Sequence, residues 1–242
     1  MTIELRNITA SYSENKVFYN FSGKISCDNL VVLMGKNGIG KSTLLDVIAG
    51  LKKIDSGSLY GIPATKKIMY MFQSTPFYSD VKVKQMIDMY KSFGKITSFE
   101  EYNISKIRDF FNENIVPLLN KNLGDLSGGE TKLVFTYSSA MVLKSLYLFD
   151  EPLSGVDPEN RIKIIKLLEE LGRKVPVIIT AHEILPFKDT NCTLKYLSSK
   201  RFIFSGNYTQ LLKNYGSTPE EAFLNLTQEM RKENKEYTRG AS

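Results

Sequence analysis

Short runs of apolar residues alternate along the chain with segments in which apolar residues recur every three or four positions. The runs have the length of strands that are buried on both faces of a sheet, and the clearest are Leu30–Met34, Ile68–Phe72, Leu146–Phe149 and Val177–Thr180. The clearest helical pattern covers Asn160–Leu171. Strands that alternate with helices predict an α/β fold with a mostly parallel sheet.

Two parts of the chain depart from this alternation. Near the N-terminus, residues 2–26 contain stretches such as 2–6 in which polar and apolar residues alternate singly, which predicts a small antiparallel β lobe. Between Gln73 and Leu126 the pattern is helical, as over 83–90 and 105–111, which predicts a helical insertion. Within the helix predicted at 160–171, the apolar stripe is expected to be Ile162, Ile165, Leu168 and Leu171.

The composition fits a globular protein of 242 residues and excludes several classes. The net charge of +6 arises from lysines mixed with acids, which predicts a solvated surface. The chain has no basic block with interleaved aromatics, so the sequence does not predict a nucleic-acid partner. No apolar run is long enough to span a membrane, and the N-terminus lacks a secretory signal, so we expect a cytosolic protein. Cys27 and Cys192 have no metal-ligand spacing and are expected to be thiols.

The strongest motif of the first half is a glycine-rich phosphate loop, residues 35–42, with the sequence GKNGIGKS. A buried strand precedes the loop and a helical pattern over 42–49 follows it, which is the context that this motif requires. Backbone N–H groups of the loop and the helix N-terminus are expected to hold phosphates. Lys41 is expected to reach the β- and γ-phosphates, and the Ser42 hydroxyl to bind Mg²⁺.

Acidic and basic side chains follow two of the predicted strands. The acidic pair, Asp150 and Glu151, comes directly after the apolar run 146–149, at the end of a strand where α/β sheets hold ligands. We expect Asp150 to hold Mg²⁺ through water and Glu151 to orient or deprotonate the attacking water. The single histidine, His182, follows the run 177–180 and is expected to donate a hydrogen bond to a γ-phosphate oxygen.

A third motif, the signature segment, is LSGGE at residues 126–130. Ser127 and Glu130 have the spacing of a capping box at the start of a helix. Two glycines beside such an N-terminus let a phosphate approach the backbone closely. Because the phosphate loop already holds one nucleotide, the signature segment is predicted to bind the nucleotide of a second subunit. Asp157, followed by Pro158, is predicted to cap another helix.

In their order and spacing these motifs, with Gln73 after a strand and LSGVD at 153–157, resemble the nucleotide-binding subunit of an ATP-binding cassette (ABC) transporter. The resemblance implies a P-loop NTPase core, ATP and Mg²⁺ as cofactors, and an ATPase domain over 1–215. It implies a helical subdomain at about 74–140, which docks on a membrane subunit, and a C-terminal helix and charged tail over 216–242. The subunit would lie on the inner face of the cell membrane.

The resemblance also assigns roles to residues. Tyr12 would stack on adenine, and ATP would be held by Gly35, Lys36, Asn37, Gly38, Ile39, Gly40, Lys41, Ser42 and Thr43. Gln73 would contact Mg²⁺ and the lytic water, and Asp157 would lie in the loop that links the two sites of a dimer. The opposing subunit's ATP would be bound by Ser127, Gly128, Gly129 and Glu130, with its γ-phosphate on Ser127 and Gly129.

The resemblance implies that ATP-driven dimerisation of two such subunits, identical or different, powers the membrane subunit. The tail over 217–226 resembles the acidic helix of exporter-type ATPases, which favours export of a drug, antibiotic or peptide; the alternative is an ordinary terminal helix. One departure is Leu133, where the family usually has a basic residue. The main alternative is an ABC ATPase of a soluble assembly complex. A nucleotide kinase or small GTPase would explain the phosphate loop but leaves the signature segment and the acidic pair without a role.

Overall fold

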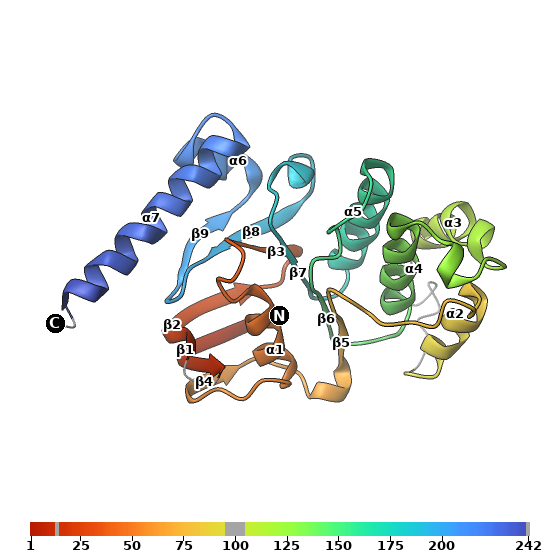
Figure 1. Cartoon of the computed structure of the whole chain (residues 1–242), viewed down its shortest axis with the longest axis horizontal. Coiled ribbons are helices and arrows are strands. Elements are labelled where there is room, and N and C mark those ends of the chain that lie inside the picture. Colours follow the sequence, from red (N-terminus) through yellow and green to blue (C-terminus); the bar gives the residue numbers. More distant parts are fainter. Residues whose placement is uncertain (13–14, 95–104, 241–242) are drawn as a thin grey trace. The chain divides into compact units, whose positions relative to one another are not determined.

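The apolar runs predicted as buried strands are strands in the computed structural model, which describes residues 1–12, 15–94 and 105–240 (Figure 1). They are β3 (Leu30–Met34), β5 (Ile68–Met71), β6 (Leu146–Phe149) and β7 (Val177–Ala181). Every residue of β3, β6 and β7 is buried, as expected for strands that are apolar on both faces except at Thr180. The predicted insertion at about 74–140 includes residues 95–104, which lie outside the described residues.

The chain divides into two units. The first unit consists of Met1–Ser26, Val31–Ile62 and Thr180–Ser242, and the second consists of Cys27–Leu30 and Pro63–Ile179. The phosphate loop and His182 belong to the first unit. The signature segment and the acidic pair belong to the second. The predicted domain boundaries at 74, 140 and 215 remain predictions.

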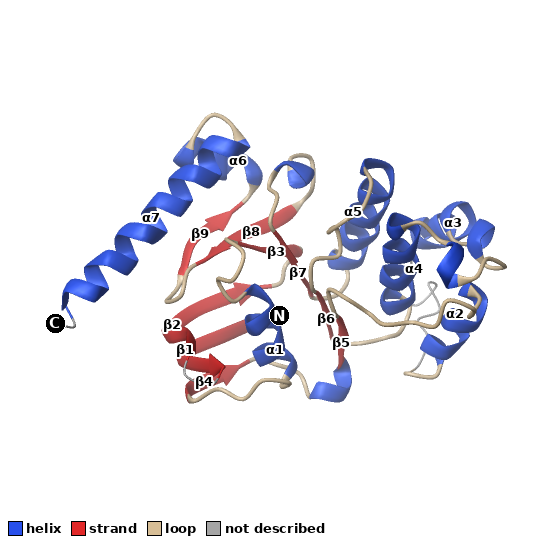
Figure 2. Ribbon diagram, viewed as in Figure 1, coloured by secondary structure: helices blue, strands red, loops and turns tan. Residues whose placement is uncertain are grey.

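In the first unit, the N-terminal alternation forms the predicted antiparallel sheet (Figure 2). Its strand order is β2-β1-β4, with β1 at Thr2–Tyr12, β2 at Asn15–Ser26 and β4 at Ser56–Tyr60. Apolar side chains of β1 that alternate with polar ones, such as Ile3 and Leu5, are buried. Strand β4 has only five residues, so the sheet is small, as predicted.

The first unit also contains strands in the order β3-β8-β9 and three helices, α1 (Lys41–Ala49), α6 (Tyr208–Tyr215) and α7 (Pro219–Gly240). The antiparallel pair β8 (Cys192–Leu197) and β9 (Phe202–Gly206) has no counterpart in the sequence analysis. The tail helix α7 packs against β8: the Tyr196 ring meets Phe223 edge-on at 6.0 Å, and its hydroxyl lies 3.2 Å from that of Thr227. A short 3-10 helix, η4, covers Leu185–Phe187.

In the second unit, β5, β6 and β7 run parallel in that order, which confirms the predicted parallel character. Their register pairs Met71 with Phe149 and Phe149 with Ile179, so neighbouring strands end side by side. The accompanying helices are α2 (Val83–Lys91), α3 (Ser105–Asn114), α4 (Gly128–Ala140) and α5 (Pro158–Gly172), with 3-10 helices η1 (Thr65–Lys67), η2 (Val116–Leu118) and η3 (Leu123–Asp125). The Tyr137 ring of α4 stacks on Phe110 and Phe111 of α3.

The predicted stripe of α5 was wrong at Ile162, whose exposed fraction is 57%. A spacing of three residues falls short of the 3.6-residue turn, so a stripe of four such positions drifts around the helix. The buried face instead combines two spacings and consists of Ile164, Ile165, Leu167, Leu168 and Leu171.

Two further expectations concern the whole chain. Within the described residues, no helix is both long and apolar enough to cross a bilayer. Cys27 and Cys192 are buried thiols, as their spacing predicted.

Candidate functional site

The phosphate loop lies between β3 and α1, as the sequence predicted. Gly38 and Gly40 both have positive φ angles, 78° and 107°. A Cβ on Gly40 would lie 2.5 Å from a Val17 methyl carbon, so both conformation and packing require glycine there. Lys41, the first residue of α1, is buried, and its ammonium donates hydrogen bonds to the carbonyl oxygens of Gly35 at 3.1 Å and Lys36 at 3.4 Å. The loop therefore holds the Lys41 ammonium through two of its backbone carbonyl oxygens.

The N-terminus of α1 has the properties of an anion site. Gly40 stands at the cap position, no side chain caps the helix there, and no acid occupies its first turn. Backbone N–H groups at such an end carry partial positive charge, and the Lys41 ammonium adds to it. Ser42, the next residue, is exposed and Thr43 is buried.

Tyr12, at the end of β1, is 47% exposed. Its hydroxyl lies 3.3 Å from an Asp46 carboxylate oxygen, and burial and the Asp46 charge raise its pKa. The Lys52 ammonium lies 4.5 Å from the ring centroid, which is a cation–π contact on one ring face. A base that stacks on Tyr12 therefore has to use the other face or displace Lys52.

The acidic pair follows β6 directly. Asp150 and Glu151 are 4% and 8% exposed, and the Asp150 N–H donates to the Met71 carbonyl of the neighbouring β5 at 2.9 Å. Glu151 has a φ of 49°, in the left-handed region that non-glycine residues rarely adopt. Backbone strain of this kind concentrates at functional sites. It also turns the chain away from the strand direction directly after Asp150.

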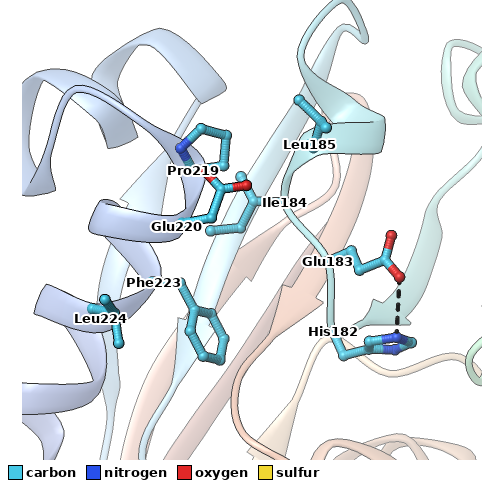
Figure 3. Close-up of a pocket in the computed structure, with 8 residues that line it drawn as sticks. All are labelled: His182, Glu183, Ile184, Leu185, Pro219, Glu220, Phe223 and Leu224. Carbon is cyan, nitrogen blue, oxygen red and sulfur yellow. Dashed lines mark ion pairs between the residues drawn. The ribbon is translucent and has the colours of Figure 1, made fainter.

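His182 follows β7, as predicted, and its side chain is 44% exposed. Its Nε2 lies 3.5 Å from Glu183 Oε1 (Figure 3). Residues 182–185 form one wall of a cavity of about 460 Å³, and the first turns of α7, with Pro219, Glu220, Phe223 and Leu224, form the other. The histidine therefore stands at the rim of a cavity that the tail helix shapes.

Gln73 lies two residues after β5, and its side chain is exposed. The ammonium of Lys132, in α4, donates a hydrogen bond to the Gln73 backbone carbonyl. The segment around Gln73 borders an aromatic groove of about 410 Å³, lined by Tyr70, Met71, Phe72, Thr75, Pro76, Phe77, Tyr78, Val81, Gln85, Met86, Met89, Tyr90, Phe93, Leu123 and Phe135.

This aromatic groove is unusual because large apolar side chains remain accessible in it. Phe72, Phe77, Tyr78, Met89 and Phe93 are each between 43% and 85% exposed. The groove was not predicted from the sequence, although the segment YMFQSTPFY at 70–78 concentrates aromatic residues around Gln73 and could have indicated it. Contiguous apolar surface of this kind is typical of protein or membrane interaction sites and of ligand-binding grooves.

The signature segment begins α4 and forms the predicted capping box. The Glu130 N–H donates to the Ser127 hydroxyl oxygen at 3.1 Å, and the Ser127 N–H donates to a Glu130 carboxylate oxygen at 2.8 Å. The backbone hydrogen bond from Ser127 lowers the pKa of Glu130, and Lys121 lowers it further. Ser127 and Gly128 are exposed, whereas Gly129 is buried.

Gly129 and Asp157 meet in the second unit. Asp157 caps α5 as predicted, accepting hydrogen bonds from the backbone and side-chain nitrogens of Asn160 at 3.0 and 2.9 Å. These bonds lower the pKa of Asp157. A Cβ on Gly129 would lie 2.1 Å from Asp157 Oδ2, whereas one on Gly128 would meet only the Gly155 carbonyl, at 3.7 Å. The structure therefore brings the signature segment against the cap of α5.

Comparison with known proteins identifies the family. The chain matches the family model described as "ABC transporter" over residues 18–154. The chain belongs to the ABC transporter family. The phosphate loop and the acidic pair, with the signature segment between them, all lie inside the matched residues. The chain is thus an ABC ATP-binding domain, and domains of this kind are ATPases.

Curated relatives agree with this assignment. The glutamine transport ATP-binding protein GlnQ of Escherichia coli is 27% identical over 92% of this chain and 98% of its own length. The maltose/maltodextrin import ATP-binding protein MalK of Aliivibrio fischeri is 32% identical over 71% of this chain and 49% of its own. The sn-glycerol-3-phosphate import ATP-binding protein UgpC of Ruegeria pomeroyi is 28% identical over 75% of this chain and 54% of its own length. The chain thus spans about half the length of MalK and UgpC.

Solved structures support the ABC ATPase fold. An ATP-binding subunit of an ABC transporter covers 94% of this chain and all of its own, with a TM-score of 0.75 and 18% identity. A nucleotide-free ATP-binding cassette covers 91% of this chain and 97% of its own, with a TM-score of 0.71 and 23% identity. At these identities the likeness concerns the fold: a P-loop core, a small antiparallel sheet and accompanying helices.

Proposed function

We propose that the chain binds and hydrolyses ATP to power a separately encoded membrane subunit of an ABC transporter. One observation carries the proposal: this chain has an uncapped helix N-terminus after its phosphate loop, at α1, and the signature segment at a second helix N-terminus, that of α4. GlnQ, which this chain covers almost completely, is by its name a transport protein. A match over nearly its whole length supports a dedicated ATP-binding subunit.

ATP is held in the first unit. Residues 35–43 surround the phosphates with backbone N–H groups, the Lys41 ammonium binds the β- and γ-phosphates, and Tyr12 stacks on adenine. The buried position of Lys41 and the absence of an acid in the first turn of α1 support this assignment. On binding ATP, the Lys41 ammonium would exchange its hydrogen bonds to the loop carbonyls for hydrogen bonds to phosphate oxygens.

Mg²⁺ fits the chemistry of the proposed ligands. Ser42, Gln73 and Asp150 offer hydroxyl, amide and carboxylate oxygens, the hard ligands that Mg²⁺ prefers in company with substrate phosphates. Among the residues described, no group of three or more His, Cys, Asp or Glu side chains could hold a metal ion without such help. When bound, Mg²⁺ supplies positive charge that neutralises the phosphate oxygens.

Glu151 orients or deprotonates the attacking water, and His182 donates a hydrogen bond to a γ-phosphate oxygen. The burial of Glu151 and its left-handed backbone support a fixed carboxylate. The exposure of His182 leaves its ring accessible to a ligand. Gln73, which follows the neighbouring strand β5, contacts Mg²⁺ and the water.

A second subunit completes the site. Ser127, Gly128, Gly129 and Glu130 face the ATP of the opposing subunit, and Asp157 lies in the loop that links the two sites. Exposure of Ser127 and Gly128 supports contact with another molecule. Because the chain carries every motif that the two halves of a site require, two identical copies can form the dimer; a heterodimer uses the same surfaces.

The aromatic groove is the proposed docking surface of the membrane subunit. It lies in the predicted helical subdomain and its wall includes Phe72, the residue before Gln73. A short helix of the membrane subunit that carries apolar side chains would bury Phe77, Tyr78 and Met89. A movement of Phe72 in the groove would then displace Gln73, because the two residues are adjacent in the chain.

The proposed direction of transport is import. The export preference drawn from the tail over 217–226 has no support among the relatives named above, since MalK and UgpC are named as import proteins. We place the chain on the cytoplasmic face of the cell membrane, where such a subunit meets ATP. An ATPase of a soluble assembly complex would instead leave the aromatic groove without a membrane partner.

The decisive experiment compares the wild-type chain with Glu151→Gln. We expect the substitution to lower ATP hydrolysis by at least about 100-fold, since removing an essential general base typically costs 10² or more. Size-exclusion chromatography with ATP and Mg²⁺ should then show a stable dimer of the Glu151→Gln chain. Adding Ser127→Asn, which keeps a capping side chain but removes the hydroxyl, should abolish that dimer. Wild-type turnover in Glu151→Gln would refute the assignment.

A further inference from the structure

Lys132 is a cation in a crowded part of the second unit to which the motifs assign no role. It lies in α4, two residues after the signature segment, and its side chain is half-buried. Its ammonium donates to the Gln73 carbonyl oxygen. Burial lowers the pKa of Lys132, while the charges of Asp150 and Glu151 oppose that effect. The ammonium therefore binds a loop carbonyl, and the negative charges of the acidic pair favour its protonated form.

The sheet places the acidic pair beside the segment that Lys132 binds. Strands β5 and β6 are parallel, with Met71 opposite Phe149, so Gln73 and the acidic pair follow neighbouring strand ends. The Asp150 N–H bonds to the Met71 carbonyl at 2.9 Å. A cation that binds the Gln73 carbonyl consequently stands at the same edge of the sheet as the two acids.

The turn of α4 that carries Lys132 is itself fixed to β5. The Thr136 hydroxyl donates to the Lys132 carbonyl at 2.7 Å and lies 3.7 Å from the Met71 sulfur. Thr136 is fully buried. The backbone of Lys132 is therefore held by packing, and its ammonium approaches the strand ends from a rigid element.

The Lys132 ammonium thus brings a positive charge to the strand ends that Gln73 and the acidic pair follow. We propose that Lys132 is a positioning residue for hydrolysis, which ties the Gln73 backbone to the signature helix beside the acidic pair. This inference rests on the proposed roles of Gln73 and Glu151.

The same contact links the two surfaces that receive partners. Helix α4 begins with the signature segment, which faces the opposing subunit in the proposed dimer, and Gln73 adjoins the aromatic groove. The hydrogen bond between Lys132 and Gln73 thus connects the signature segment with the aromatic groove within one unit. Its loss should lower the rate of the chemical step while leaving ATP binding, which belongs to the first unit, nearly intact.

The test measures kcat and KM for MgATP with the full chain in the variants Lys132→Met, Lys132→Gln and Lys132→Arg. We expect Lys132→Met to lower kcat roughly 10- to 100-fold, as loss of residues that orient metal and catalytic groups does, with KM nearly unchanged. Lys132→Gln keeps a hydrogen-bond donor without the charge and should remain impaired. Lys132→Arg restores the charge and should recover most of kcat.

Lys144→Met is the matched control. The Lys144 ammonium also donates to backbone carbonyls of the second unit, those of Lys66 at 2.9 Å and Phe93 at 3.2 Å, and is also half-buried. It should keep nearly wild-type kcat. A general loss of stability would affect both lysine variants, and unfolding midpoints show whether it does.

Three results would overturn the inference: wild-type kcat in both neutral variants, a higher KM with unchanged kcat, or an equal loss of kcat in Lys144→Met. If Lys132→Met does not fold, Lys132→Gln decides alone. Glu151→Gln separates this inference from the proposed function. If it abolishes turnover while the Lys132 variants behave as wild type, only the role of Lys132 fails; if it turns over normally, the proposed function fails.

Discussion

The two helix N-termini that the motifs place at ATP, those of α1 and α4, differ in the charge that they already hold. Helix α1 starts at Gly40 with no side-chain cap and no acid in its first turn, and its first residue is the cation Lys41. Helix α4 starts at Ser127, which forms a capping box with the acid Glu130. An anion is needed to complete α1, whereas α4 already has one.

This difference changes how the signature segment is expected to work. Two helix N–H groups that a free N-terminus would offer to phosphate are less available here: the Glu130 N–H donates to the Ser127 hydroxyl oxygen, and Gly129 is buried. What α4 presents outward is the Ser127 hydroxyl and the exposed Gly128. The phosphate loop is thus an anion site in its own right. The signature segment is a shaped surface that contributes when a second subunit supplies the nucleotide.

The largest predicted effect tests the first half of this comparison. Lys41→Met removes the cation from the uncapped helix and should weaken ATP binding by the isolated chain on the order of 10- to 100-fold, since hydrogen bonds to charged groups contribute about 1.5–3 kcal/mol. Calorimetric titration with a non-hydrolysable ATP analogue measures this. Lys53→Met, an exposed lysine of the same unit, should bind normally. Unchanged affinity in Lys41→Met would show that the loop binds without its cation.

The second prediction uses the two glycines of the signature segment against each other. Gly129→Ala places a methyl group 2.1 Å from Asp157 Oδ2 and should reduce the free energy of unfolding by about 1–3 kcal/mol, the usual cost of overpacking. In Gly128→Ala the methyl group meets its nearest neighbour at 3.7 Å, so stability should be equal or higher by up to about 1 kcal/mol. Urea denaturation compares the pair. Equal stability of the two variants would mean that α4 and the α5 cap are not in close contact.

Much of the fold follows from the sequence because local patterns decide it. Apolar runs bounded by turns predicted β3 and β6 to the residue, and the placement of glycine and lysine predicted the phosphate loop. The caps at Ser127 and Asp157 involve neighbours three residues apart, so spacing alone predicted them.

The features that the sequence left undetermined depend on contacts between distant segments. The closeness of Gly129 to Asp157 and the bond from Lys132 to Gln73 join residues 28 and 59 positions apart. No local pattern encodes them. Ile162 shows the converse error, since a regular spacing was extended beyond the helix face that packing buries. The acids after β6 were predicted, but the left-handed backbone of Glu151 was not.

The smallest predicted effect tests the charge that α4 carries. The pKa of Glu130 is lowered from 4.5 in the folded chain, so its carboxylate stabilises the fold fully above about pH 4.5. This stabilisation is lost as the pH falls through the lowered pKa that Glu130 has in the folded chain. Glu130→Gln keeps the capping hydrogen bond without the charge and should cost a few tenths of a kcal/mol at pH 7, as expected for a partly exposed charge.

The difference between wild type and Glu130→Gln should therefore disappear as the pH falls, which unfolding at a series of pH values measures. A Glu130 difference that persists unchanged at low pH would mean that its charge does not serve α4. Helix α4 would then differ from α1 only in the hydrogen bonds of its cap, and not in having an anion of its own.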